Sequence, residues 1–152
     1  MKTIRIATFT ILAASALATA GCGSGSQAYD DGYKTYVNTL NSIQADDCII
    51  DNAPFGQFLK ADEAPKPPQI VPCGNSSSVK VFAVGDLAGP YAQAKDQADS
   101  LCKAAVDKVP DSEAQQYMLP GSTDLNYKII YPSLQEDWDH GFHKAICYLS
   151  LI

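Results

Sequence analysis

Arginine is nearly missing from this chain, because Arg5 is the only one in 152 residues. Arginine is the side chain that proteins favour for bidentate contacts with carboxylate and phosphate groups. Bases are also outnumbered, with 11 Lys and Arg against 17 Asp and Glu and a formal net charge of −6 at pH 7. Nucleic-acid binding requires a basic surface that neutralises phosphates. We therefore predict no nucleic-acid partner, and the lack of arginine disfavours nucleotide and phosphoryl-transfer sites.

The chain also lacks an apolar run of the roughly 20 residues that a helix needs to cross a bilayer. Its one marked apolar run, residues 6–18, follows a short basic start with Lys2 and Arg5. This order of a basic start, a short apolar run and a tail of small residues is the layout of a secretory signal peptide. We predict that residues 1–21 are a signal peptide. The remaining chain then has nine basic and 17 acidic residues, a formal charge of −8.

The tail Thr19-Ala20-Gly21 leads into Cys22 and resembles a bacterial lipobox, although Thr19 stands where leucine is usual. In a lipobox the cysteine is diacylated and becomes the first residue of the mature protein. Cys22 is the predicted lipidation site, and residues 22–28 are predicted to be a flexible tether. Acyl chains on one residue give stable anchoring, so we expect the protein at the outer face of the cytoplasmic membrane. The alternative is ordinary cleavage, with Cys22 as a free thiol.

Five cysteines are an odd number, and assigning Cys22 to lipid leaves an even set. Small exported domains use such sets to form disulfides. Three pairings are possible. We favour Cys48–Cys73 with Cys102–Cys147, partly because the first pair brackets a proline-rich segment at residues 60–69. The close CxxC spacing of zinc sites is missing, so no metal and no cofactor are predicted.

Helical and strand patterns are interspersed along residues 29–152. Apolar spacing of three and four predicts one helix at residues 29–43 and the main helix between Gly89-Pro90 and Pro110. Short helices are predicted at residues 111–118 and after Ser133, where Ser133 and Glu136 have capping-box spacing and Gly141 could end the helix. Strands are predicted at residues 48–50, 79–84, 125–131 and 145–151.

The predicted fold class is therefore α+β. We expect a small mixed or antiparallel sheet that packs against one main helix and is stapled by two disulfides.

Five short segments also occur in a fixed order along the chain. They are Ile70-Val71-Pro72-Cys73, the apolar run at 81–87, Cys102, Tyr131-Pro132, and Trp138-x-x-Gly141 before Cys147. This series resembles the actinobacterial septum formation domain family, whose members are mostly membrane-tethered or lipidated extracytoplasmic proteins. The resemblance covers roughly residues 46–150. It implies one extracytoplasmic domain over residues 29–152 and a link to cell division or envelope growth, but no defined chemistry.

Acids and imidazoles cluster only between positions 137 and 143, where the sequence has Asp137, Trp138, Asp139, His140 and His143. Asp139 and His143 have the four-residue spacing of metal ligands on one helical face, but Gly141 interrupts that helix. Trp138 is expected to be a core anchor near Cys147. We predict no catalytic residues here and treat the five residues as a candidate interaction surface.

The sequence thus predicts a non-enzymatic surface lipoprotein with a binding role in the envelope. Its expected partners are the membrane, through a diacylglyceryl group on Cys22, and an envelope protein that the sequence does not identify. The alternative is a prophage- or plasmid-encoded surface lipoprotein that blocks a receptor or modulates the envelope. An enzymatic role would require a polar pocket around Asp139, His140 and His143.

Overall fold

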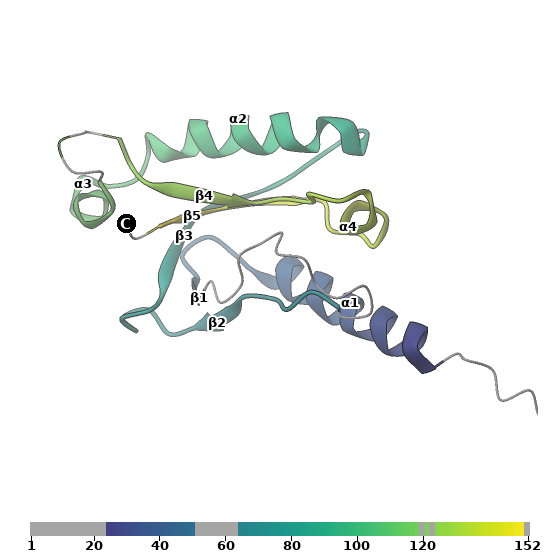
Figure 1. Ribbon diagram of the computed structural model, residues 1–152. Coiled ribbons are helices and arrows are strands. Elements are labelled where there is room, and N and C mark those ends of the chain that lie inside the picture. The colour runs from purple at the N-terminus through teal and green to yellow at the C-terminus, as the bar shows by residue number, and fades with distance from the viewer. Residues whose placement is uncertain (1–23, 51–63, 119–120, 122–123, 151–152) are drawn as a thin grey trace, which may run out of the picture.

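The computed structural model describes residues 24–50, 64–118, 121 and 124–150 (Figure 1). Five strands form one sheet in the order β2-β1-β3-β5-β4, and all neighbouring strands are antiparallel. The strands are β1 (Cys48–Ile50), β2 (Gln69–Val71), β3 (Val79–Asp86), β4 (Tyr127–Ile130) and β5 (Lys144–Leu149). The helices are α1 (Ser24–Ser42), α2 (Ala94–Val106), α3 (Asp111–Ala114) and α4 (Gln135–Asp139). The predicted α+β class is confirmed.

Helices cover both faces of the sheet, with α2 on one side and α1 on the other (Figure 1). The central strand β5 explains this arrangement, because residues 145–150 are all buried. Successive side chains on a strand point to opposite faces. Ala145 therefore packs in the α2 cluster, whereas Ile146 and Tyr148 pack in the α1 cluster. An apolar run buried on both faces needs two covering layers, and α1 and α2 provide them.

Helix α1 covers its face of the sheet with the apolar stripe that the sequence predicted. All five stripe residues are buried, namely Tyr33, Tyr36, Val37, Leu40 and Ile43. The helix begins at Ser24, so residues 24–28 are helical and do not form the predicted tether. Most helix stability in proteins comes from packing of the apolar face, and this packing can extend a helix over residues such as Gly25 whose own helix propensity is low. The predicted signal peptide and Cys22 lie outside the described residues.

A bulge in β3 adjusts the sheet to α2. Val81 pairs with Tyr148 and Ala83 with Cys147, so Phe82 is the extra residue. Paired residues on neighbouring strands share a face. Gly85, two residues beyond Ala83, consequently faces α2, and a Cβ placed there would lie 2.1 Å from Leu101 Cδ1. Glycine at this position lets the helix approach the sheet closely.

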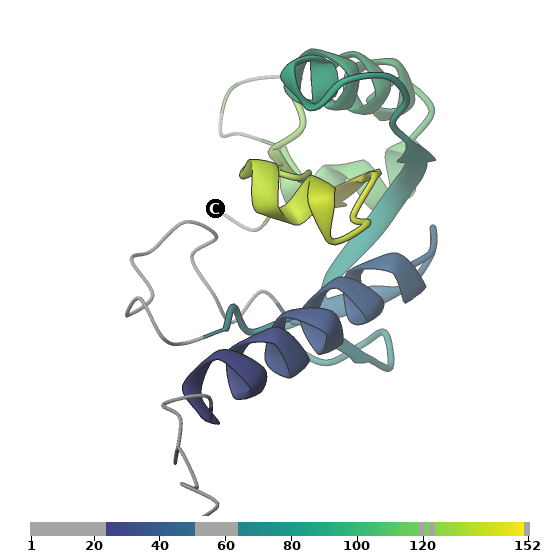
Figure 2. The same cartoon turned by 90° about the vertical axis from the view of Figure 1, so that its right-hand side faces the viewer.

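Helix α4 lies at one end of the sheet, between the layers formed by α1 and α2 (Figures 1 and 2). Among the described residues, no helix combines the length and apolar character needed to span a membrane.

Candidate functional site

Both favoured disulfides are present, and they differ in environment. Cys48–Cys73 joins β1 to the segment after β2, with a Cα–Cα distance of 5.2 Å. Cys48 is buried, but Cys73 is exposed. Cys102–Cys147 joins α2 to β5 at 5.6 Å, and both of its residues are 0% exposed. Two disulfides in one small domain indicate an oxidising, extracytoplasmic environment.

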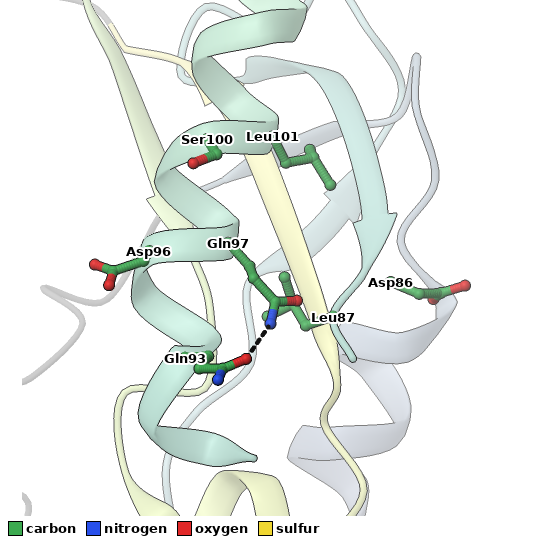
Figure 3. A pocket seen from close by; sticks show the side chains of 7 residues that line it. All are labelled: Asp86, Leu87, Gln93, Asp96, Gln97, Ser100 and Leu101. Carbon is green, nitrogen blue, oxygen red and sulfur yellow. Dashed lines mark hydrogen bonds between the residues drawn. The ribbon is translucent and has the colours of Figure 1, made fainter. Parts of the chain in front are cut away.

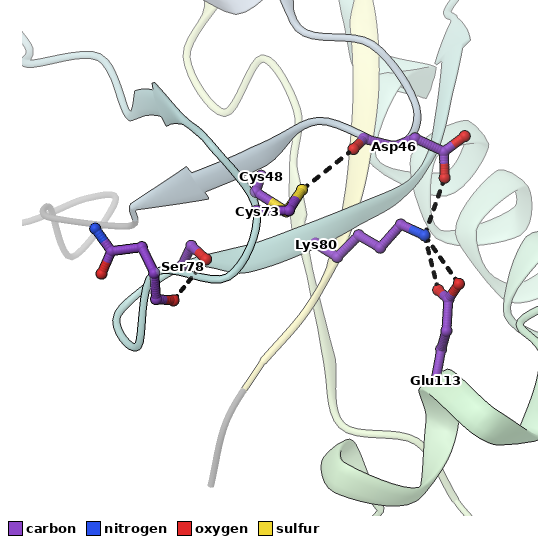
Figure 4. The surroundings of a disulfide bond; sticks show 7 residues. Asp46, Cys48, Cys73, Ser78, Lys80 and Glu113 are labelled. Atoms are coloured by element: carbon purple, nitrogen blue, oxygen red, sulfur yellow. Dashed lines mark hydrogen bonds and ion pairs between the residues drawn. A yellow bond between two sulfur atoms is a disulfide. The ribbon is translucent and has the colours of Figure 1, made fainter.

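Near the exposed disulfide, an ion-pair triad links the sheet to α3 (Figure 4). Lys80 Nζ lies 3.0 Å from an Asp46 carboxylate oxygen and 2.9 Å from one of Glu113. Hydrogen bonds to Glu113, and then to Asp46, raise the pKa of Lys80. Asp46 has a φ of 73°, so it occupies the left-handed region where the chain turns into β1. Because Lys80 is paired with both carboxylates, it has a structural role, which the sequence alone did not indicate.

The predicted interaction residues begin with Asp137, which is buried rather than exposed. Its carboxylate accepts a hydrogen bond from the Tyr33 hydroxyl at 2.5 Å and another from the Leu134 backbone N–H at 3.0 Å. Asp137 therefore caps α4, in place of the predicted box between Ser133 and Glu136. With 4% of its surface exposed, Asp137 is not available to a partner. Gly141 ends the helix as predicted, with a φ of 89°.

Glu136 is occupied by a second tyrosine of α1, because it accepts a hydrogen bond from the Tyr29 hydroxyl at 3.1 Å. Tyr29 and Tyr33 are one helical turn apart and meet adjacent acids on α4. The pKa of Tyr33 is raised mainly by burial and, to a smaller extent, by the hydrogen bond to Asp137. Burial is also the main cause of the raised pKa of Tyr36. The tyrosine spacing was visible in the sequence, but nothing there identified α4 as the partner.

The two histidines point to different neighbours. His140 Nδ1 lies 2.9 Å from the Glu136 carbonyl oxygen, and its ring is 4.6 Å from that of Tyr33. His143 Nε2 lies 2.8 Å from the Trp138 carbonyl oxygen, and its ring stacks on Trp138 at 4.1 Å. Asp139 instead accepts a hydrogen bond from the Gln135 side chain at 2.8 Å. Each side chain required by the enzymatic hypothesis thus has a separate hydrogen-bond partner.

Trp138 is half-buried and packs against the α2 cluster, with the Tyr91 ring 6.5 Å away in an edge-on arrangement. Tyr91 in turn donates a hydrogen bond to the Ser133 carbonyl oxygen at 2.7 Å. The surface that α4 presents therefore comprises Asp139, His140 and His143, together with Leu134, which is 57% exposed. Within the described ranges, no group of three or more Cys, His, Asp or Glu is placed to hold a metal ion.

A first cavity, of about 430 Å³, lies beside the first turns of α2 (Figure 3). Gln97 crosses it and pairs with the Ala88 backbone, donating to the carbonyl oxygen at 2.6 Å and accepting from the N–H at 3.0 Å. Asp86 and Asp96 line the cavity, but their carboxylates point away from each other (Figure 3). They do not form an acid and base pair.

A second cavity, of about 620 Å³, lies where the end of α2, α3 and the start of β4 meet. We call it the α2–α3 pocket. Its apolar lining consists of Val106, Val109, Ala114, Met118, Leu125 and Tyr127. These residues come from three separate segments, so no local pattern in the sequence could predict the pocket.

Comparison with protein-family models, with curated proteins and with solved structures found no match to this chain.

Proposed function

We propose that this protein is a non-enzymatic lipoprotein of the cell envelope that binds another envelope component. It is exported through the signal peptide at residues 1–21 and held at the outer face of the cytoplasmic membrane by a diacylglyceryl group on Cys22. The resemblance to the septum formation domain family suggests envelope growth or division as the process that it serves.

The observation that carries the proposal is the pair of disulfides. Small domains with disulfides are typical of oxidising compartments, and the Cys102–Cys147 bond is wholly inside the core. This use of four cysteines leaves Cys22 as the one cysteine outside a disulfide. A thiol at that position, directly after a short apolar segment and small residues, is the substrate expected for lipidation.

A binding role is supported by how the polar residues of α4 are used. Asp137 caps the helix and receives Tyr33, and each histidine has a ring nitrogen within hydrogen-bond distance of a backbone carbonyl. General acid and base catalysis requires groups that converge on a common substrate position. The contacts of these residues instead hold α4 together, and the hydrogen bond from Tyr33 to Asp137 joins it to α1.

The anchor is tested by Cys22→Ser in the natural host or a related cell. We expect the unaltered protein in the membrane fraction and the variant in the medium or soluble fraction. The mass of the N-terminal peptide should also exceed that of the unmodified peptide by the mass of the diacylglyceryl group and any added acyl chain. Cys73→Ser is a matched control because it changes a cysteine outside the signal region, and it should leave the protein in the membrane fraction.

Membrane retention of Cys22→Ser, or a mature N-terminus without lipid, would contradict the anchor. The binding role is tested separately by cross-linking in intact cells. We expect the same envelope protein to be captured repeatedly by the unaltered chain, while recovery of no envelope protein above background would count against the role.

A further inference from the structure

The α2–α3 pocket combines an apolar lining with an acidic rim. Its volume of about 620 Å³ lies within the range of roughly 300–1,000 Å³ that is usual for ligand sites. Five of its apolar side chains, including Met118 and Tyr127, are only partly buried. Tyr and Met are enriched in protein interfaces. The partly buried Phe82 ring lies 5.9 Å from that of Tyr127 in an edge-on arrangement and packs beside it. The pocket therefore presents apolar surface with a supported aromatic side chain.

The charged residues of the rim determine which partner fits. Asp107 and Asp111 line the pocket between the end of α2 and the start of α3, and Lys103 is the one base among the described lining residues. The excess of negative charge favours a cationic group and repels phosphate and carboxylate groups. A partner segment with an apolar side chain next to lysine or arginine could place the apolar group against the lining and the positive charge against the acidic rim.

The position of the pocket also suits a partner outside the membrane. In Figure 1, α3 lies at the end of the molecule opposite the beginning of α1. If Cys22 carries the lipid, as proposed above, the beginning of α1 is the end nearest the membrane. The pocket beside α3 then lies at the end of the molecule away from the bilayer, where a segment of another protein can reach it.

We propose that the α2–α3 pocket binds a basic peptide segment of a partner protein, with an apolar side chain inserted between α2 and α3 and flanking Lys or Arg residues paired with the acidic rim. This inference rests on the proposed binding role and gives it a site and a partner chemistry.

The test is fluorescence anisotropy at low salt with labelled pentapeptides and the full exported chain. The probe has a central Lys-Leu-Lys, and two control peptides have Glu-Leu-Glu and Lys-Gly-Lys. We expect the probe to bind more tightly than either control, because the first control reverses the charge and the second removes the apolar anchor. Added salt should weaken binding by screening the exposed charges.

Two double variants locate the site. Asp107→Asn with Asp111→Asn should weaken probe binding by about three- to tenfold, as expected for two partly screened charges at the rim. Asp86→Asn with Asp96→Asn removes the same charge from the first cavity and should leave binding unchanged. Leu125→Ala should weaken binding without changing its dependence on salt, since it alters only the apolar lining.

Three results would each overturn the proposal: no anisotropy change of the labelled probe at millimolar protein, equal binding of the Glu-Leu-Glu peptide, or an equal effect of the two double variants. The same measurement on Cys22→Ser separates this inference from the anchor. If Cys22→Ser stays in the membrane but binds the probe normally, the anchor alone is refuted. If Cys22→Ser is released from the membrane as expected but the protein does not bind the probe, the peptide site alone is refuted.

Discussion

The two faces of the sheet are closed by different means. On the α2 face, the fully buried residues of the helix itself are small, namely Ala94, Ala98 and Cys102, and the Cys102–Cys147 disulfide ties the helix to the central strand. On the α1 face, the core contains large side chains such as Tyr33, Leu40 and Phe142, and the described part of α1 carries no disulfide.

This difference reflects how much apolar area each helix can bury. Small side chains allow a close approach but remove little apolar surface from water, and hydrophobic stabilisation scales with that area, at about 25 cal/mol per Å². A covalent link offsets the deficit on the α2 face. Helix α1 buries larger side chains and adds the polar contacts of Tyr29 and Tyr33 to α4. We therefore expect the α2 face to depend on its disulfide and the α1 face to depend on packing and hydrogen bonds.

The largest expected effect is the loss of the buried disulfide. Cys102→Ala with Cys147→Ala opens a loop of 45 residues, and chain entropy predicts a loss of about 4 kcal/mol in the free energy of unfolding. Cys48→Ala with Cys73→Ala, which opens a loop of 25, should cost less, at most about 3.5 kcal/mol. Urea unfolding of both double variants measures the difference. Equal stability of the first variant and the unaltered protein would show that α2 is held by packing alone.

The next effect concerns the α1 face. Tyr33→Phe removes the hydrogen bond to the buried carboxylate of Asp137, and we expect a loss of about 2 kcal/mol, typical of a hydrogen bond to a charged group. Tyr127→Phe is a control at a more exposed tyrosine and should cost less. Unfolding in urea at pH 7 compares the two variants, and equal losses would mean that the contact with Asp137 adds nothing.

The same residue predicts a dependence on alkaline pH. The folded-state pKa of Tyr33 lies above its unfolded value of about 10, so the folded protein binds this proton more tightly. The contribution of the protonated Tyr33 to the free energy of unfolding is complete below about pH 10, and it is lost as pH rises through the folded-state pKa. Stability between pH 9 and 11 should fall more steeply for the unaltered protein than for Tyr33→Phe. Parallel curves would contradict this assignment.

The smallest effect returns to the α2 face. Gly85→Ala places a methyl group against Leu101, whose side chain must shift, and we expect a loss of about 1 kcal/mol from overpacking. Leu101→Ala provides the space, so Gly85→Ala should cost less in that background. A double-mutant cycle by urea unfolding measures this coupling, and additive losses would show that the two residues do not limit the approach of α2.

Much of the fold was visible locally in the sequence. The stripe from Tyr33 to Ile43 predicted the buried face of α1, because residues three and four apart share one side of a helix. Gly141 predicted the end of α4, because a positive φ favours glycine. The pairing of the four cysteines was a choice among three, and the proline-rich segment between Cys48 and Cys73 pointed to the correct one.

The sequence did less well where partners come from distant segments. It predicted Asp137 as part of an exposed surface, but Tyr33, 104 positions away, donates to its carboxylate in the interior. The burial and pairing of a polar group depend on which helices and strands are in contact, and these contacts are determined by the packing of the whole core.

By itself, the sequence determined most of the elements, though not β2 or the first turn of α1, and it determined the acidic charge and the cysteines available for disulfides. These features depend on residue type and short-range spacing. Only the tertiary structure decided that α1 and α2 take opposite faces, that the acids of α4 receive the tyrosines of α1, and that three segments enclose the α2–α3 pocket. The physical reason is that a side chain's environment is a sum over neighbours in space, and most of those neighbours are remote along the chain.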